Sequence, residues 1–153
     1  MTIVHIFGFE RPEALELAEK CGIGFQLTNI LRDIPEDAAR GRVYLPEEDL
    51  DRFSLSAEDL LDPARSRDLM RFEWERAAGY YREATPLLGM VRKQNRPALW
   101  AMMSIYRGVL ERIREQDFDV VSGRPRLAAM EKSLVVAKAA RSRWFGGPLP
   151  SPA

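Results

Sequence analysis

The sequence predicts an all-α protein with one domain. Apolar residues recur at helical spacing in every long segment, strand-like alternation is scarce, and breakers such as Gly41, Pro46 and Pro86 separate the segments. The 153 residues are 46% apolar and 30% charged, which is typical of a soluble globular domain. The 23 Lys and Arg residues balance the 23 Asp and Glu residues. Because phosphate backbones attract an excess of positive charge, this balance argues against a nucleic-acid partner.

The first helix is expected to begin near Pro12 and to run into the mid-thirties, because proline fits the first turn of a helix. Its apolar residues are spread around most of its circumference, so we expect a central helix that is largely enclosed by protein. These residues are Leu15, Leu17, Ala18, Cys21, Phe25, Leu27, Ile30 and Leu31.

Residues 40–53 are expected to form a loop, since a glycine and a proline interrupt the helical pattern there. Ser56 and Asp59 have the spacing of a capping box, which predicts a short helix that ends at Pro63. An amphipathic helix should follow and continue to Pro86, where the ring of proline interrupts it.

The most regular helical stripe lies between Pro97 and Ile113, where apolar residues keep a three-and-four spacing throughout. A loop is expected at residues 122–125, followed by a last helix over 127–144. We therefore assign residues 1–145 to one domain and the Gly- and Pro-rich residues 146–153 to a disordered tail.

Polar residues occupy one side of the first helix. At about 100° per residue, Gln26, Asn29, Asp33 and Asp37 fall within about 80° of one another. Carboxylate and amide oxygens are the ligands of Mg²⁺, particularly where it also contacts substrate phosphates. The stripe therefore predicts a metal–diphosphate site, although Pro35 cannot donate the helical bond to residue 31 and predicts a distorted last turn.

The alternative interpretation is an acidic helix end on a solvated face, because acidic residues at this spacing are common on ordinary helices. In that case the carboxylates would form ion pairs with nearby arginines. The acidic residues are Asp33, Glu36 and Asp37, and the candidate partners are Arg32, Arg40 and Arg42. Spacing alone leaves both interpretations open.

The local sequence favours the metal interpretation. Residues 24–46 read GFQLTNILRDIPEDAARGRVYLP, and this run resembles the second aspartate-rich signature of the squalene/phytoene synthase family. Weaker similarity continues at Ile105-Tyr106-Arg107, which resembles a late helix of that family, and at residues 118–132, which resemble its closing basic segment. Within this segment, Gly123 occupies a position where many family members have a basic residue, so Arg124 is the remaining basic candidate there.

The resemblance implies an isoprenoid-synthase-type helical bundle that joins two prenyl diphosphates, farnesyl or geranylgeranyl, head to head with Mg²⁺. It implies that Asn29, Asp33 and Asp37 bind the metal and that Gln26 lines the pocket for the diphosphate or the cyclopropyl intermediate. The resemblance also implies that five further residues contact the diphosphate or the intermediate: Arg32, Arg42, Tyr44, Tyr106 and Arg124. Asp33, Asp37, Arg32 and Tyr106 are the expected catalytic residues. NADPH is implied only if the product is squalene.

The family also has a first aspartate-rich motif in its N-terminal half, and the sequence contains no such segment. We therefore expect an incomplete bundle, the C-terminal half of the fold, that is inactive alone and associates with a missing N-terminal half. Residues 1–4 resemble the inside of a family helix, so Met1 is read as an internal methionine. The single cysteine and the lack of a signal or membrane-spanning segment predict a cytoplasmic location, with transient membrane association through a lipophilic product.

Two functions thus compete. The first is a prenyl synthase half that makes a phytoene-type or squalene-type product. The second is a non-catalytic helical interaction module, in which the acidic stripe only pairs with arginines and an exposed face docks a partner.

Overall fold

The computed structural model describes residues 8, 12–145, 147, 149–150 and 152, and every regular element in that part of the chain is a helix. The long helices are α2 (Ala14–Ala38), α4 (Pro63–Ala84), α6 (Arg96–Glu115) and α7 (Ala129–Phe145). The short ones are α3 (Glu47–Arg52), η1 (Glu58–Leu61), α5 (Leu87–Met90) and η2 (Lys93–Asn95). The prediction of an all-α fold is confirmed.

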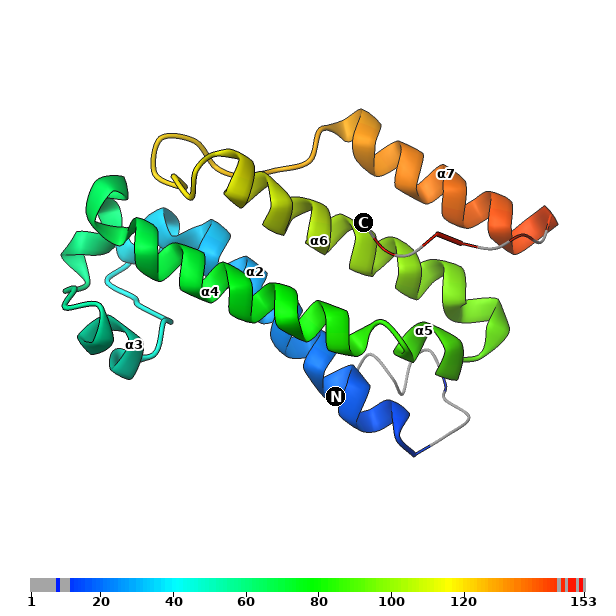
Figure 1. The fold of residues 1–153 in the computed structure, drawn as a ribbon. Helices are drawn as coiled ribbons and strands as arrows, with labels where there is room; N and C mark the ends of the chain where they lie inside the picture. The colour runs from blue at the N-terminus through cyan, green and yellow to red at the C-terminus, as the bar shows by residue number, and fades with distance from the viewer. Residues whose placement is uncertain (1–7, 9–11, 146, 148, 151, 153) are drawn as a thin grey trace.

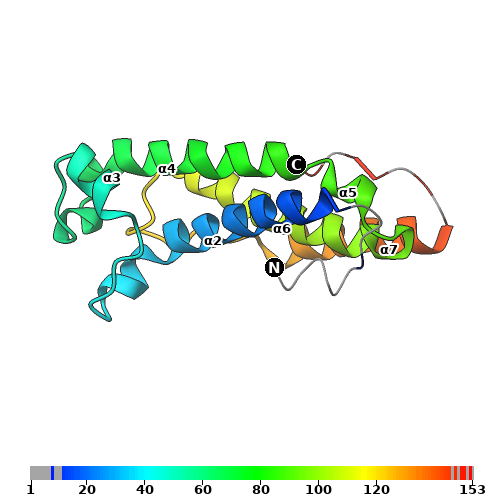
Figure 2. The ribbon, with the colours of Figure 1, turned by 90° about the horizontal axis from the view of Figure 1, so that it is seen from below.

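The helices form an elongated bundle (Figure 1). α2 packs against both α4 and α6, as predicted for a central helix, and α7 packs on α6 on the side away from α4 (Figures 1 and 2). α3 lies at the end of the bundle where α4 begins (Figures 1 and 2), and a hydrogen bond of 2.7 Å joins its Asp49 to Arg76 of α4. The segment that follows the acidic stripe is therefore at the periphery of the fold.

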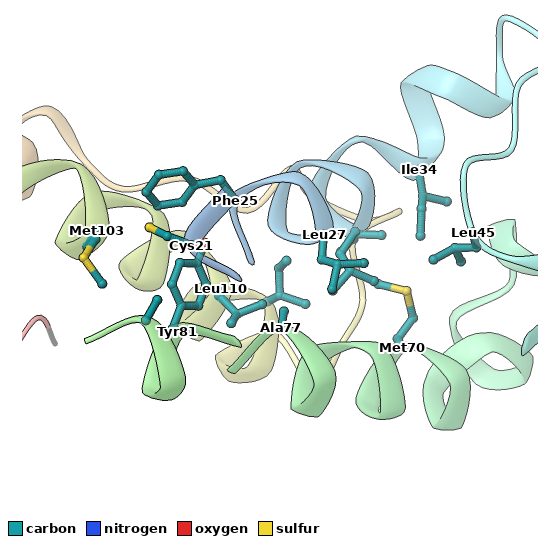
Figure 3. Close-up of a cluster of buried hydrophobic side chains, with 14 of the residues drawn as sticks. Cys21, Phe25, Leu27, Ile34, Leu45, Met70, Ala77, Tyr81, Met103 and Leu110 are labelled. Carbon is teal, nitrogen blue, oxygen red and sulfur yellow. The ribbon is translucent and has the colours of Figure 1, made fainter. Parts of the chain in front are cut away.

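The core fills the space between α2, α4 and α6 (Figure 3). The helix α4 contributes a row of fully buried residues, spaced four apart, that faces α2: Leu69, Glu73, Ala77 and Tyr81. From α2, Cys21 is 1% exposed and Leu31 is fully buried. Burial raises the pKa of the Cys21 thiol to about 12, so the thiol stays protonated.

A close contact between α2 and α4 fixes how the two helices meet. A Cβ atom added at Gly24 would lie 3.3 Å from the ring of Tyr81, so a side chain there would require the ring to shift by a few tenths of an ångström. The hydroxyl of Tyr81 lies 2.8 Å from Oγ1 of Thr28, which itself donates to the carbonyl of Gly24 at 2.8 Å. Figure 3 shows Tyr81 pointing from α4 toward Cys21 and Phe25 of α2.

The predicted helix boundaries hold, with one exception. α2 continues through Pro35, where the N–H of Ala39 still bonds to the Pro35 carbonyl at 3.1 Å, so the proline does not end the helix. Half of the predicted capping box is present: Asp59 accepts from the N–H of Ser56 at 2.8 Å, whereas in the described structure the Ser56 hydroxyl donates to Asp59 at 3.0 Å and caps no backbone N–H.

The prediction of an uninterrupted loop over residues 40–53 is wrong. Residues 47–52 form α3, with Pro46 just before its first turn and three acidic residues in that turn. Negative charge stabilises a helix N-terminus, so Pro46 and the acidic residues after it mark the start of a helix as well as a break in the preceding pattern.

The chain ends lie partly outside the described residues. The expectations for residues 1–4, and for 146, 148, 151 and 153 of the tail, concern such residues. Of the tail residues that are described, Pro150 accepts a hydrogen bond from Nε1 of Trp100 at 2.7 Å, and Gly147 accepts one from the Ser142 hydroxyl at 2.9 Å. These contacts lay the described tail residues along α6 and α7.

Candidate diphosphate site on α2

The polar stripe predicted from the sequence lies on one continuous helix. Asn29, Asp33 and Asp37 are each partly buried along α2, and Gln26 is exposed. Because α2 remains helical past Pro35, the four residues keep the successive turns on which the prediction rests.

Asp33 is the best-connected residue of the stripe. Its two carboxylate oxygens accept from Nε and Nη2 of Arg32 at 2.7 and 2.6 Å, and Oδ1 also accepts from Nη2 of Arg124 at 2.7 Å. Arg124 donates at the same time from Nη1 to Glu36 at 2.6 Å. The structure thus joins the stripe to a basic residue that lies far along the chain.

These contacts set the charge state of Asp33. Partial burial works to raise the pKa of its carboxyl, but hydrogen bonds and positive charge from Arg32 and Arg124 outweigh burial and hold that pKa below its usual value. The hydrogen bond to Asp33 in turn raises the pKa of Arg32. Asp33 is therefore an ionised carboxylate between two arginines.

The loop before α7 holds Arg124 in place. The side chain of Asp119 accepts from the N–H groups of Val121 and Ser122 at 3.0 and 2.9 Å, and Nε2 of Gln116 donates to the carbonyl of Gly123 at 2.9 Å. Because these bonds fix the loop from within, Arg124 is presented to α2 by a preformed turn. Sequence reasoning identified Arg124 but missed the supporting roles of Asp119 and Gln116, for which an Asx turn was the available signal.

Asp37 lies in a second part of the site, at the C-terminal end of α2. It lines a narrow hollow together with Arg42 and Tyr44, both of which are exposed. The turn that brings them back is fixed by the N–H of Arg42, which bonds to the Asp37 carbonyl at 2.9 Å, and by Gly41 in the left-handed conformation with φ of 66°. The structure therefore brings Arg42 and Tyr44 next to Asp37.

Tyr106 adds an aromatic side to the stripe. Its ring packs against that of Phe25, with centroids 4.4 Å apart, and it is close enough to Arg32 to raise the pKa of that residue. Tyr106 is half-buried, whereas Tyr81, whose ring centroid lies 5.8 Å from that of Phe25, is fully enclosed. Tyr106 thus belongs both to the core and to the side of α2 that carries Arg32.

The donor set of the stripe fits Mg²⁺ in its chemistry. Magnesium is commonly bound by one or two carboxylates while phosphates and waters complete six oxygen ligands. Asp33 and Asp37 supply two carboxylates and Asn29 an amide oxygen on the same helix. In the described part of the chain, the stripe included, no group of three or more His, Cys, Asp or Glu side chains is arranged to hold a metal ion by itself.

Comparison with known proteins agrees with this geometry. The sequence pattern of squalene/phytoene synthases matches residues 1–131. The chain belongs to the squalene/phytoene synthase family. Its predicted membership is thereby confirmed, and the match includes α2, the following turn and the loop with Arg124.

Relatives within the squalene/phytoene synthase family include two bacterial enzymes. The 15-cis-phytoene synthase of Synechocystis sp. is 37% identical over 131 residues, covering 81% of this chain and 39% of that protein. The phytoene synthase of Mycobacterium tuberculosis is 37% identical over 153 residues, covering 96% of this chain and 51% of that protein. The chain therefore spans about half the length of the relatives that it matches.

A solved structure of a family member has the same fold. A dehydrosqualene synthase in complex with a ligand superposes with a TM-score of 0.75 and 29% identity, covering 86% of this chain and 48% of the other. The helical bundle is thus the isoprenoid-synthase type, present here over about half of its length. No helix within the described residues is long and apolar enough to cross a membrane.

Proposed function

We propose that this chain supplies the second acidic helix of a prenyl synthase that condenses two farnesyl or geranylgeranyl diphosphates head to head, in the context of a complete enzyme. The observation that carries this proposal is the ionised Asp33 between Arg32 and Arg124. A carboxylate for a metal and cations for a diphosphate are thereby joined at one place. The names of the relatives favour a phytoene-type product.

Each residue of the site would have a specific role in this chemistry. Asn29, Asp33 and Asp37 would hold Mg²⁺, which when bound neutralises negative charge on a leaving diphosphate. Arg32 and Arg124 orient Asp33 and contribute positive charge beside it. Arg42 and Tyr44 extend that side of the site past Asp37.

The organic part of the substrate requires different surroundings. Loss of diphosphate leaves an allylic cation, which an aromatic face stabilises without reacting with it. Tyr106 and Phe25 pack together beside Arg32 and offer such a face next to the polar stripe. Gln26, exposed on the same side of α2, would contact the diphosphate or the intermediate.

Titration of the chain with inorganic diphosphate, with and without Mg²⁺, tests the proposal by calorimetry. We expect binding that depends on Mg²⁺ and weakens about tenfold or more in Asp33→Asn and Arg124→Gln, because hydrogen bonds to charged groups contribute about 1.5–3 kcal/mol each. Arg141→Gln is the matched control, since Arg141 is exposed on α7 and far along the chain from the stripe. Equal affinity in all four proteins would refute the assignment.

The second candidate function is a non-catalytic helical interaction module. It is favoured by α7, which exposes apolar side chains along its length, among them Met130, Leu134 and Val136. Magnesium-independent diphosphate binding together with concentration-dependent self-association in sedimentation would favour this function over the synthase.

A further inference from the structure

A second cluster of charged residues lies away from the polar stripe and joins α3 to α4. Arg76 of α4 donates from Nη1 to Oδ2 of Asp49 at 2.7 Å and from Nη2 to Oδ1 at 3.2 Å. The same Nη1 also donates to Oε1 of Glu73 at 2.8 Å. One guanidinium thus serves two carboxyl groups from two helices.

Glu73 is unusual because its carboxyl is entirely enclosed. It is 0% exposed, in the middle of the apolar row of α4, and its Oε2 has no donor within reach in the described structure. Burying a second negative charge beside Asp49 is costly when only one guanidinium is present. A proton on Oε2 removes that charge and lets Glu73 donate toward Asp49.

The other charged groups around this cluster are few. Arg76 lies on the helix of Glu73, with Tyr80 one turn further on, and α3 contributes Asp49 and Arg52. In the described structure Arg52 forms no ion pair with Glu73; its guanidinium stacks on the ring of Phe72, 4.5 Å from the centroid, and that of Arg76 stacks on the same ring at 4.7 Å. The charge of Glu73 is therefore opposed mainly by Arg76.

The cluster also controls a segment of the candidate site. Asp49 is on α3, which begins directly after Pro46, and the preceding residues carry Arg42 and Tyr44. At its other end this segment is fixed to α2 by the turn at Gly41. The position of α3, together with the buried Leu45, therefore limits where Arg42 and Tyr44 can lie.

We propose that Asp49, Glu73 and Arg76 form a proton-dependent clasp that positions Arg42 and Tyr44 by holding α3 against α4. The roles of Arg42 and Tyr44 rest on the proposed function, whereas the clasp itself does not. With Glu73 protonated, the cluster holds one positive and one negative charge, and α3 is docked. When Glu73 loses its proton, two carboxylates compete for Arg76, and α3 is released together with Asp49.

The environment of Glu73 places this change near neutral pH. Burial raises the pKa of Glu73 to about 7, opposed by the charge of Arg76 and assisted by Asp49. Interaction with Arg76 meanwhile lowers the pKa of Asp49, so Asp49 stays ionised while Glu73 titrates. Glu73 is thus the residue whose proton sets the state of the clasp.

Hydrogen exchange of the full 153-residue chain, measured from pH 6 to 8 and corrected for the intrinsic pH dependence of exchange, tests the clasp without substrate. We expect protection of residues 42–52 to fall about tenfold across this range in the wild type. Between the ordinary pKa of Glu73, 4.5, and its raised pKa of about 7, each rise of one pH unit favours the released state up to tenfold, and the effect levels off above that. Glu73→Gln keeps the shape of the side chain but cannot lose a proton, so the protection of residues 42–52 should change less than twofold over the same pH range. Glu75→Gln, at an exposed position on the same helix, is the matched control and should behave as wild type.

Asp49→Asn provides a second variant at the outer side of the cluster. It weakens the bidentate pair with Arg76, so residues 42–52 should lose protection at every pH while the amides of α6 remain protected. The proposal is overturned if protection of residues 42–52 is independent of pH in the wild type, if Glu73→Gln keeps the wild-type pH dependence, or if Asp49→Asn leaves these residues protected. A clasp that responds as expected in a chain that fails to bind diphosphate would contradict the proposed function and leave the clasp standing.

Discussion

The hydroxyl pair between α2 and α4 allows a prediction in which two similar substitutions have unequal effects. Thr28 Oγ1 uses its only hydrogen on the Gly24 carbonyl, so the Tyr81 hydroxyl must be the donor of the bond between them. Both side chains are fully buried. Thr28→Val removes the acceptor and leaves the Tyr81 hydroxyl enclosed without a partner, whereas Tyr81→Phe leaves Thr28 still bonded to Gly24.

The magnitudes follow from this difference. A buried polar group without a partner costs about 1–3 kcal/mol, whereas loss of an ordinary hydrogen bond costs about 0.5–1.5 kcal/mol. We therefore expect Thr28→Val to lower the free energy of unfolding more than Tyr81→Phe does. The double variant contains no unpaired hydroxyl. Its free energy of unfolding should therefore fall by about 1 kcal/mol less than the sum of the decreases in the two single variants.

Urea unfolding followed by circular dichroism measures the three variants and the wild type under one condition. Ser104→Ala is a suitable control, because the buried hydroxyl of Ser104 has no hydrogen-bond partner in the described structure and its removal breaks no pair. The reasoning would be refuted if Tyr81→Phe proved the more damaging substitution, or if the two single losses simply added in the double variant.

Three further predictions concern the site and the buried carboxyl. The isolated chain should form no condensation product from farnesyl or geranylgeranyl diphosphate with Mg²⁺, because one acidic helix does not complete a diphosphate clamp; any product detected by chromatography would contradict this. With an N-terminal half restored, Asp33→Asn should lower turnover at least tenfold and leave the melting temperature without Mg²⁺ nearly unchanged. A lower melting temperature with normal turnover would instead identify Asp33 as a structural ion-pair partner. Protonated Glu73 should contribute its full stability below its ordinary pKa of 4.5, and this contribution should be lost as pH rises through about 7. Between these pH values the free energy of unfolding of the wild type, measured in urea, should fall by up to about 3 kcal/mol relative to that of Glu73→Gln.

Local patterns were enough to predict the long helices and the stripe. The four-residue stripe on α2 depends only on the period of a helix, and α2 keeps that period through Pro35 because the neighbouring turns retain their bonds. α3 was missed because Pro46 interrupts a helix and also precedes one, and only the acidic residues after it distinguish the two cases.

The contacts between distant segments were beyond a periodic pattern. Arg124 reaches Asp33 across 91 residues, and only the resemblance to a family suggested that the two belong together. Glu73 is different: the sequence-based prediction omits it, although its spacing of four from Leu69 and Ala77 puts it in the buried row of α4. A charged residue in the middle of an apolar stripe is a readable signal, but its partner on α3 depends on how the chain folds back.

The buried thiol of Cys21 can be used to measure how often α2 separates from α4. Cys21 is on the face of α2 that meets α4, and with a pKa of about 12 it is both hidden and unreactive while the helices are together. An alkylating reagent can therefore modify the chain only in moments when α2 lifts away. Since α2 also carries Asn29, Asp33 and Asp37, the rate of alkylation reports how often the helix that bears the acidic stripe separates from its neighbours, and no substitution is needed.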